Sequence, residues 1–242
     1  MALPDQREAV FVRIREALQR PAPHRHDGHV DYDMSGHSGV ETPPPESDAF
    51  RAWLPSVGPS IDDQITLFAQ NAAQLKADFR PVASLDEAAR QLAALASENG
   101  WKRVASHRHS VASGVAEKLG LPCLLTDSGY ATAELEQCDA AITGCDALVA
   151  QTGSVLVTNP SAGGRALSVL PPHHIVIAQR SQIVPDLASA LQLVRKLYAP
   201  NWPSFLSFIT GPSRTGDIER ILVLGAHGPK KLTIFLLPYH SL

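Results

Sequence analysis

Cysteine is scarce in this 242-residue sequence, which contains only Cys123, Cys138 and Cys145 and has no C-x-x-C spacing. An iron–sulfur cluster usually takes four thiolate ligands, and a disulfide framework takes an even number of cysteines. The sequence also lacks the full Gly-x-Gly-x-x-Gly fingerprint of a dinucleotide fold and the Lys-Ser/Thr ending of a P-loop. We therefore expect buried structural cysteines and no cofactor bound by this chain alone.

Long apolar runs and an excess of one charge are also missing. No apolar run reaches the roughly 20 residues that cross a bilayer, and the N-terminus MALPDQREAVFVRIREALQR is too charged for a signal peptide. The net charge of -3 and the pI near 6.3 give no overall basic field. We therefore expect a cytoplasmic protein that contacts neither membrane nor nucleic acid.

The first 60 residues differ in texture from the rest. Apolar residues at helical spacing predict an amphipathic helix over 4–20, which Pro21 and Pro23 end. Residues 21–60 are rich in Pro, His, Gly, Ser and Asp and show no periodicity. Such a composition buries too little apolar surface to offset the entropy of ordering. The sequence predicts a helical and irregular N-terminal arm over 1–60, outside the main core, and one domain over 61–242.

Helices and strands alternate after the arm. Helices are predicted over 61–77, 85–98, 110–119, 132–137 and 185–198, with Ser60 and Ser84 as N-caps. Apolar, β-branched strands are predicted at 79–83, 102–106, 121–126, 140–143, 147–150, 154–158, 173–179, 205–210, 221–226 and 232–237. This alternation indicates an α/β fold with a mainly parallel sheet flanked by helices. In such sheets, ligands bind beyond the carboxyl ends of the strands.

The segment TGPSRTGD follows the predicted strand at 205–210 and leads into a predicted short helix over 217–220. Free backbone N–H groups at a helix start, together with a guanidinium, would hold a carboxylate or phosphate. The alternative is a structural turn whose Arg214 pairs with Asp217 or Glu219. The candidate ligand-binding residues of this loop are Thr210, Gly211, Ser213, Arg214 and Asp217.

Two further loops carry similar chemistry. In AHGPKK, the turn needs Gly228 and Pro229 but has no structural need of His227, which with Lys230 would transfer a proton or contact an anion. In QTGSVLVTNPSAGGRALSVL, polar and glycine residues flank a predicted strand and resemble a backbone anion cradle. The candidate ligand-binding residues there are Thr152, Gly153, Ser154, Gly163, Gly164 and Arg165.

We expect the three loops to fold to one edge of the sheet. Ser213, Arg214, His227, Lys230 and Arg165 would then surround a single pocket for a small anion, which would balance their charges. His107 and His109 follow another predicted strand, so one of them is also a candidate for that edge.

The blocks SVLVTNPSAGGRALSVLPPHHIVIAQRSQIVPDLASAL and FITGPSRTGDIERILVLGAHGPKKLTIFLL closely resemble the LUD domain of the lactate-utilisation protein C family (LutC/YkgG). The resemblance implies a fold like that of the NagB/RpiA/CoA-transferase group. It also implies a cytoplasmic system that oxidises L-lactate to pyruvate, with iron–sulfur and cysteine-rich partner proteins. Gln151 stands where many members of the family carry an acidic residue.

Three functions remain open from the sequence. The chain is a component of lactate oxidation that acts with its partners, or a free-standing enzyme of the CoA-transferase or sugar-phosphate isomerase kind, or a non-catalytic binding module. A CoA-transferase would use a glutamate nucleophile, for which Glu219 is the candidate. The candidate catalytic residues are His227, Lys230 and Glu219.

Overall fold

The computed structural model divides into two units, Met1–Phe50 and Arg51–Leu242, and describes residues 54–109, 111–215, 223–224 and 228–238, all in the second unit. The predicted helix over 4–20 and most of the arm therefore lie outside the described residues. The last residues before Ser60 belong to the folded unit, because Val57 packs against a core cluster and the Pro55 carbonyl accepts a hydrogen bond from Gln151.

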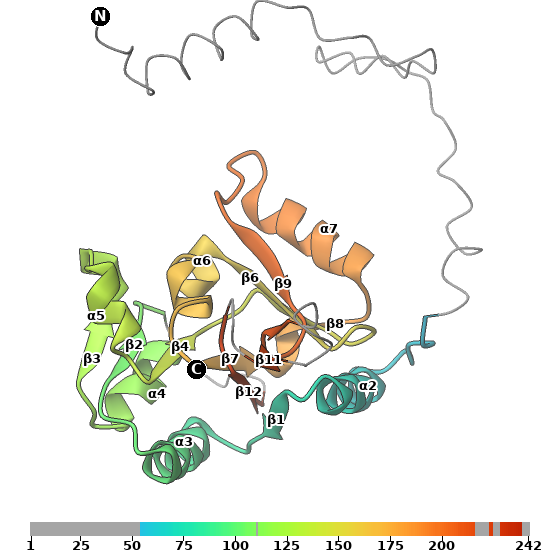
Figure 1. Cartoon of the computed structure of the whole chain (residues 1–242). Coiled ribbons are helices and arrows are strands. Elements are labelled where there is room, and N and C mark those ends of the chain that lie inside the picture. Colours follow the sequence, from blue (N-terminus) through green and yellow to red (C-terminus); the bar gives the residue numbers. More distant parts are fainter. Residues whose placement is uncertain (1–53, 110, 216–222, 225–227, 239–242) are drawn as a thin grey trace, which may run out of the picture. The chain divides into compact units, whose positions relative to one another are not determined.

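The described elements follow the predicted alternation (Figure 1). The helices are α2 (Ile61–Gln74), α3 (Leu85–Asn99), α4 (Ala112–Lys118), α5 (Thr132–Glu136), α6 (Asn159–Ala162) and α7 (Leu187–Tyr198). The strands are β1 (Asp78–Pro81), β2 (Val104–Ser106), β3 (Cys123–Leu125), β4 (Ala140–Thr143), β5 (Ala147–Val149), β6 (Ser154–Thr158), β7 (His173–Gln179), β8 (Ile183–Val184), β9 (Leu206–Ile209), β10 (Arg214–Thr215), β11 (Val223–Leu224) and β12 (Lys231–Leu237).

The main sheet has six strands in the order β1-β12-β7-β4-β2-β3, and every pair in it is parallel. The longest pairing joins β7 and β12, with Lys231 beside His173 and Leu237 beside Gln179. Because all six strands point the same way, the sheet has an amino edge, where the strands begin, and a carboxyl edge, where they end. The predicted α/β fold with a mainly parallel, helix-flanked sheet is confirmed.

Several predicted strands lie outside the main sheet. A second sheet has the order β8-β5-β6-β9, and β6 runs antiparallel to both of its neighbours. The predicted strand at 221–226 is described only as β11, which pairs antiparallel with β10. The prediction of a mainly parallel sheet therefore holds for the main sheet, and these strands form separate, largely antiparallel pairings. The predicted helix over 217–220 lies outside the described residues.

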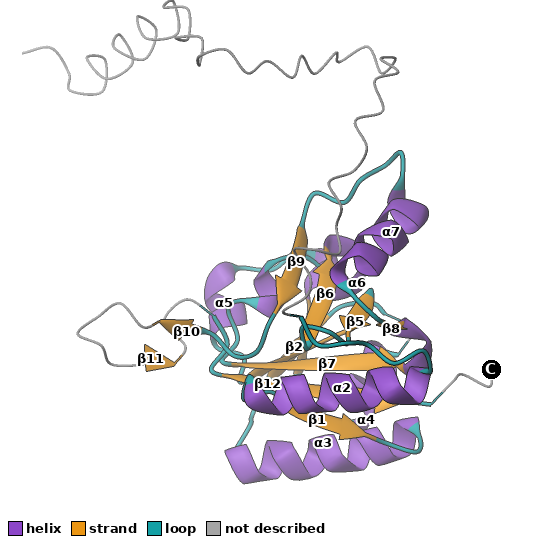
Figure 2. Cartoon of the chain, turned by 90° about the vertical axis from the view of Figure 1, so that its right-hand side faces the viewer, coloured by secondary structure: helices purple, strands orange, loops and turns teal. Residues whose placement is uncertain are grey.

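Side chains on the two faces of the main sheet pack against different layers. Ile175 and Ile177 face α3 and α4, whereas Val176 and Ala178 face α2 and the second sheet. The far face of the second sheet packs against α7 through Ala190 and Val194. The layers are therefore α3 with α4, the main sheet, the second sheet with α2, and α7 (Figure 2).

Local signals fix the helix ends. Ser60 and Asp63 form a capping box at the start of α2, and Ser84 caps α3 by accepting a hydrogen bond from the Glu87 backbone N–H. Gly100 ends α3 in the left-handed conformation at φ 65°. These caps confirm the predicted starts of both helices.

Candidate functional site

The loop TGPSRTGD and the Thr152-Gly153-Ser154 turn meet at the start of β6. Thr152 donates a hydrogen bond to the Ser154 hydroxyl at 2.8 Å, and the Ser154 and Thr210 hydroxyls lie 2.8 Å apart. They meet because β6 and β9 are antiparallel, which places the start of one beside the end of the other. The glycines here serve a close approach to α2. A Cβ on Gly153 would lie 2.9 Å from the Asn71 side chain, and one on Gly211 would lie 2.7 Å from the Leu75 carbonyl.

The turn before β12 meets the same region. The Ser213 backbone N–H donates to the Pro229 carbonyl at 2.9 Å, and the Lys230 N–H donates to the Pro172 carbonyl at 2.8 Å. Lys230 therefore lies at the amino edge of the main sheet, directly before β12. Arg214 is exposed in β10. The predicted residues Asp217, Glu219 and His227 lie outside the described residues.

The loop with Gly163, Gly164 and Arg165 lies elsewhere, beyond the far end of β6. Gly163 ends α6 at φ 63°, and a Cβ there would lie 2.4 Å from the His107 side chain at the carboxyl edge. Arg165 stacks over the Phe205 ring at 5.2 Å. The expectation of one pocket that joins Arg165 with Lys230 is therefore wrong. The expectation assumed that all the strands before these loops end at the same edge of one sheet, whereas the second sheet is largely antiparallel. The ligand-binding roles of these residues remain predictions.

A cleft of about 400 Å³ opens at the carboxyl edge. It lies beyond the ends of β2, β4 and β7, three neighbouring parallel strands, where α/β folds bind ligands. Residues from α6 and α7 complete it. The lining residues are His109, Cys145, Asp146, Pro160, Ser161, Ser181, Gln182, Leu193, Leu197 and Tyr198.

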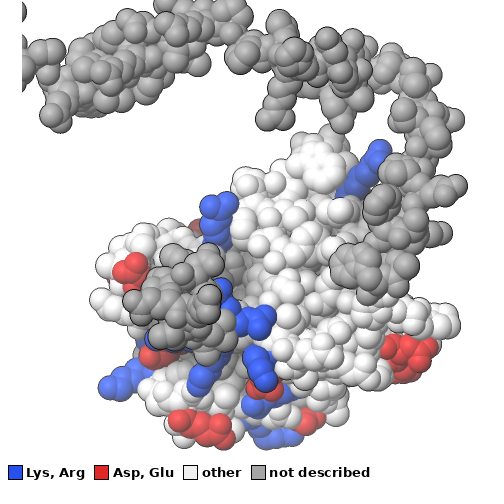
Figure 3. Space-filling model, turned by 45° about the vertical axis from the view of Figure 1, so that its right-hand side comes forward, with Lys and Arg blue, Asp and Glu red and all other residues white. Residues whose placement is uncertain are grey.

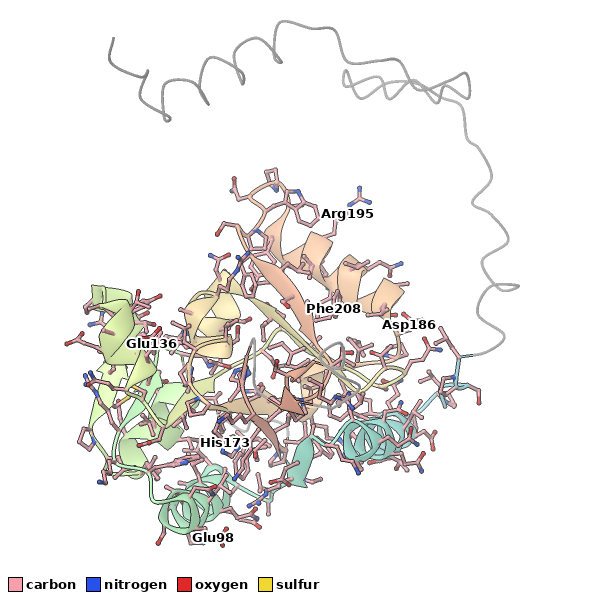
Figure 4. The ribbon with its side chains drawn as sticks, viewed as in Figure 1. Glu98, Glu136, His173, Asp186, Arg195 and Phe208 are labelled. Carbon is pink, nitrogen blue, oxygen red and sulfur yellow. The ribbon has the colours of Figure 1, made fainter. Side chains whose placement is uncertain are left out.

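Asp146 is the centre of a hydrogen-bonded group in this cleft. Its carboxylate is 8% exposed and accepts hydrogen bonds from the Ser161 hydroxyl at 2.6 Å and the Tyr198 hydroxyl at 2.5 Å. Burial, followed by the hydrogen bond to Asp146, raises the pKa of Tyr198 to about 12, so the phenol keeps its proton and remains a donor. Asp146 thus joins α6 and α7 to the chain that leads into β5. Figure 4 shows the side chains around this part of the ribbon.

His109 supplies the second chemical group of the cleft. Its Nδ1 accepts from the Val111 and Ala112 backbone N–H groups, each at 3.4 Å, so the hydrogen of the neutral ring is on Nε2. Burial lowers the pKa of His109, and the negative charge of Asp146 opposes that shift. The ring packs on Gly144, where a Cβ would lie 2.5 Å from Nε2. His109 is therefore a neutral hydrogen-bond donor beside a buried carboxylate.

Two other groups border this pair. His107 is 2% exposed, its ring lies 5.4 Å from that of His109, and its Nε2 has no hydrogen-bond partner. Gln182 donates to the Cys145 carbonyl at 2.5 Å. Burial raises the pKa of the Cys145 thiol, which therefore stays protonated.

The expectation of buried cysteines is confirmed for Cys138 and Cys145 but is wrong for Cys123, which is exposed on the edge strand β3. A strand at the edge of a sheet is covered on one side only, which the sequence pattern does not reveal.

Sequence reasoning placed His107 and His109 at a carboxyl edge but missed Asp146, Ser161, Gln182 and Tyr198. Asp146 follows a predicted strand by three residues in Gly144-Cys145-Asp146, which was an available signal. Tyr198 is the last residue of α7 and meets Asp146 across 52 residues, so no local pattern identifies it.

No helix among the described residues is long and apolar enough to cross a membrane. In the same part of the chain, no group of three or more His, Cys, Asp or Glu side chains is placed to hold a metal ion.

Comparison with known proteins gives consistent matches. A model of the LUD domain family matches residues 65–237. The "Lactate utilization protein C" of Shouchella clausii is 30% identical over 179 residues, which cover 71% of this chain and 78% of that protein. The proteins of the same name from Anoxybacillus flavithermus and Deinococcus radiodurans are 36% and 32% identical. These two matches span about half of each relative, at 45% and 55% of its length.

Among solved structures, the chain is similar to a DUF162 family protein from Deinococcus radiodurans, with a TM-score of 0.57. The sequence identity is 22%, and the match covers 74% of this chain and 99% of the other. At this identity the similarity concerns the fold.

Proposed function

Because the chain belongs to the LUD domain family, and because the relatives described above are named for lactate utilisation, we propose that it takes part in lactate utilisation. The proposed role is that of a cytoplasmic component in the oxidation of L-lactate to pyruvate. In this role the carboxyl-edge cleft holds the small organic acid.

The observation that supports this role is the placement of His109 and the Asp146 group in one cleft, close enough for the carboxylate to act on the pKa of the imidazole. The Nε2–H of His109 would donate a hydrogen bond to the oxygen that changes from hydroxyl in lactate to carbonyl in pyruvate. Asp146 is the carboxylate among the described lining residues and would accept the hydroxyl proton. A carboxylate oxygen accepts more than one hydrogen bond, so Ser161 and Tyr198 do not block this role.

The reaction also requires an electron acceptor. Oxidation of lactate to pyruvate releases two electrons and two protons. Asp146 would take the hydroxyl proton, and the C2–H bond would break with its proton passing to solvent and its two electrons to the acceptor. The chain would bind no cofactor alone, and the electrons would pass to redox centres of iron–sulfur and cysteine-rich partner proteins. On this proposal, the protein purified anaerobically by itself has neither iron–sulfur nor flavin absorption. A stoichiometric cluster in the isolated chain would contradict this assignment.

Isothermal titration with L-lactate and pyruvate tests the cleft directly. His109→Asn keeps a polar side chain near the Nδ1 position but has no donor at the Nε2 position. We expect it to weaken binding about tenfold, which corresponds to about 1.4 kcal/mol. Glu98→Gln, an exposed change at the end of α3, is the control and should bind like the wild type.

Reconstitution tests the wider role. The chain mixed with iron–sulfur partner proteins should support lactate-dependent reduction of an artificial electron acceptor, and His109→Asn should slow it. Absence of binding of both acids, together with reduction that does not depend on this chain, would refute the proposal.

A further inference from the structure

Three lysines gather at the amino edge of the main sheet, away from the carboxyl-edge cleft. Lys76 follows α2, and Lys230 and Lys231 lie at the start of β12. They line two hollows of about 170 and 220 Å³, and His173, Lys230 and Lys231 belong to both. Lys and Arg side chains gather on the face that Figure 3 shows, and Figure 4 labels His173 at this edge.

The acidic side chains beside the lysines are engaged by other donors. Asp139 accepts hydrogen bonds from the backbone N–H groups of Lys102 and Arg103 at 2.6 and 3.0 Å. Asp78 pairs with Arg80 at 2.8 Å. Lys231 donates to the neutral Asn99 side chain at 2.6 Å.

Within the described part of the chain, neither Lys76 nor Lys230 forms an ion pair. Asp139 and Asp78 line one hollow each, so the lysines outnumber the carboxylates and leave an excess of positive charge, which an anion would balance.

His173 adds a feature that charge alone does not explain. Its side chain is 4% exposed, and its Nε2 lies 2.9 Å from the Thr233 hydroxyl. Thr233 donates its own hydrogen to Asp78 at 3.4 Å, so it accepts from the Nε2–H of His173. Burial, with the charge of Lys231, lowers the pKa of His173 to about 4 and keeps the ring neutral. Its Nδ1 is therefore a buried acceptor, and it has no hydrogen-bond partner.

Lysines near helix ends have an ordinary structural explanation. The carboxyl ends of α2 and α3 attract positive charge, which accounts for the place of Lys76 and for the contact of Lys231 with Asn99. That explanation leaves the unpartnered Nδ1 of His173 unexplained. A buried acceptor normally has a donor, and this one has none among the described residues, although its residue lines both hollows.

We propose that the amino-edge hollow binds a small anion that also has an O–H group. The negative charge would lie between the ammonium groups of Lys76 and Lys230, and the O–H would donate to Nδ1 of His173. Two kinds of molecule share this chemistry, namely a hydroxycarboxylate and a phosphate that retains one proton. The site is separate from the carboxyl-edge cleft, so the proposal does not depend on the function of that cleft.

Titration calorimetry of the full chain at constant ionic strength tests the proposal with three probes. Inorganic phosphate and L-lactate each contain a negative charge and an O–H group, whereas propionate has the carboxylate of lactate without the hydroxyl. We expect phosphate, L-lactate or both to bind and propionate to bind at least about tenfold more weakly. Whichever probe binds identifies the class of ligand.

Variants separate this hollow from the cleft. Lys230→Gln and Lys76→Gln, both at exposed positions, should each weaken binding at the hollow about tenfold, whereas the exposed change Lys118→Gln should leave it unchanged. His109→Asn should weaken only the lactate binding of the cleft. Imidazole nitrogen NMR should show a shift of the His173 Nδ1 signal on binding, and circular dichroism checks the fold of each variant. No binding of phosphate or lactate, equal binding of propionate, or unchanged binding by Lys230→Gln would each overturn the proposal.

Discussion

Replacement of Asp146 by Ala should destabilise the protein strongly. The change removes the carboxylate that accepts hydrogen bonds from the Ser161 and Tyr198 hydroxyls, at 2.6 and 2.5 Å. Hydrogen bonds to a charged group contribute about 1.5–3 kcal/mol each. Relief of the buried charge offsets part of that loss, as does the contact of Tyr198 with Thr158 at 3.1 Å. We therefore expect the free energy of unfolding to fall by about 3 kcal/mol.

Urea denaturation followed by circular dichroism measures this change. For a chain of this size, a loss of about 3 kcal/mol corresponds to a fall in Tm of about 6–12 °C. Asp146→Asn retains one acceptor oxygen, so it should cost about half as much. Glu98→Ala is the exposed control. If the free energy of unfolding of Asp146→Ala lies within about 0.5 kcal/mol of the wild-type value, as is usual for surface substitutions, the carboxylate does not hold α6 and α7 in place.

Two other measurements test the buried groups. The pKa values of His173 and His174 in the folded protein are about 4 and about 3, below the ordinary 6.5, so the unfolded chain takes up protons first as the pH falls. The contribution of these histidines to the free energy of unfolding should therefore be complete above about pH 6.5. It should decrease toward pH 4, by about 1.4 kcal/mol per pH unit for each histidine. Urea midpoints that stay constant from pH 7 to pH 5 would contradict burial of the neutral rings. Gly144→Ala places a Cβ 2.5 Å from the His109 ring, so it should displace the ring and weaken pyruvate binding in calorimetry. Unchanged affinity would show that pyruvate binding does not need His109 in this position.

The local elements were predictable because short stretches of sequence determine them. The strand over 173–179 was predicted to its bounds, since Pro171 and Pro172 precede it and its centre is the apolar, β-branched run 175–178. Ser60 and Ser84 were identified as N-caps for the same reason, because a cap depends only on the next three residues.

The assignment of strands to sheets was not predictable. All five residues of β6 are buried, so no alternation of polar and apolar residues indicates which sheet the strand joins or its direction. The prediction of a single pocket was wrong because it depended on the sheet and the direction assigned to this strand. The candidate site depends equally on distant parts of the chain, because Tyr198 and Asp146 meet only after α7 packs on the second sheet.

The link between the two sheets has a consequence for ligand choice. β4 ends at Thr143 in one sheet and β5 begins at Ala147 in the other, so Gly144, Cys145 and Asp146 make the whole crossing. The four Cα–Cα steps from Thr143 to Ala147 span at most about 14 Å, so the sheets cannot move far apart at this link to fit a larger molecule. The floor of the cleft is thus preorganised, and adaptation to different ligands falls to exposed side chains of the α7 wall such as Leu197, which lines the cleft.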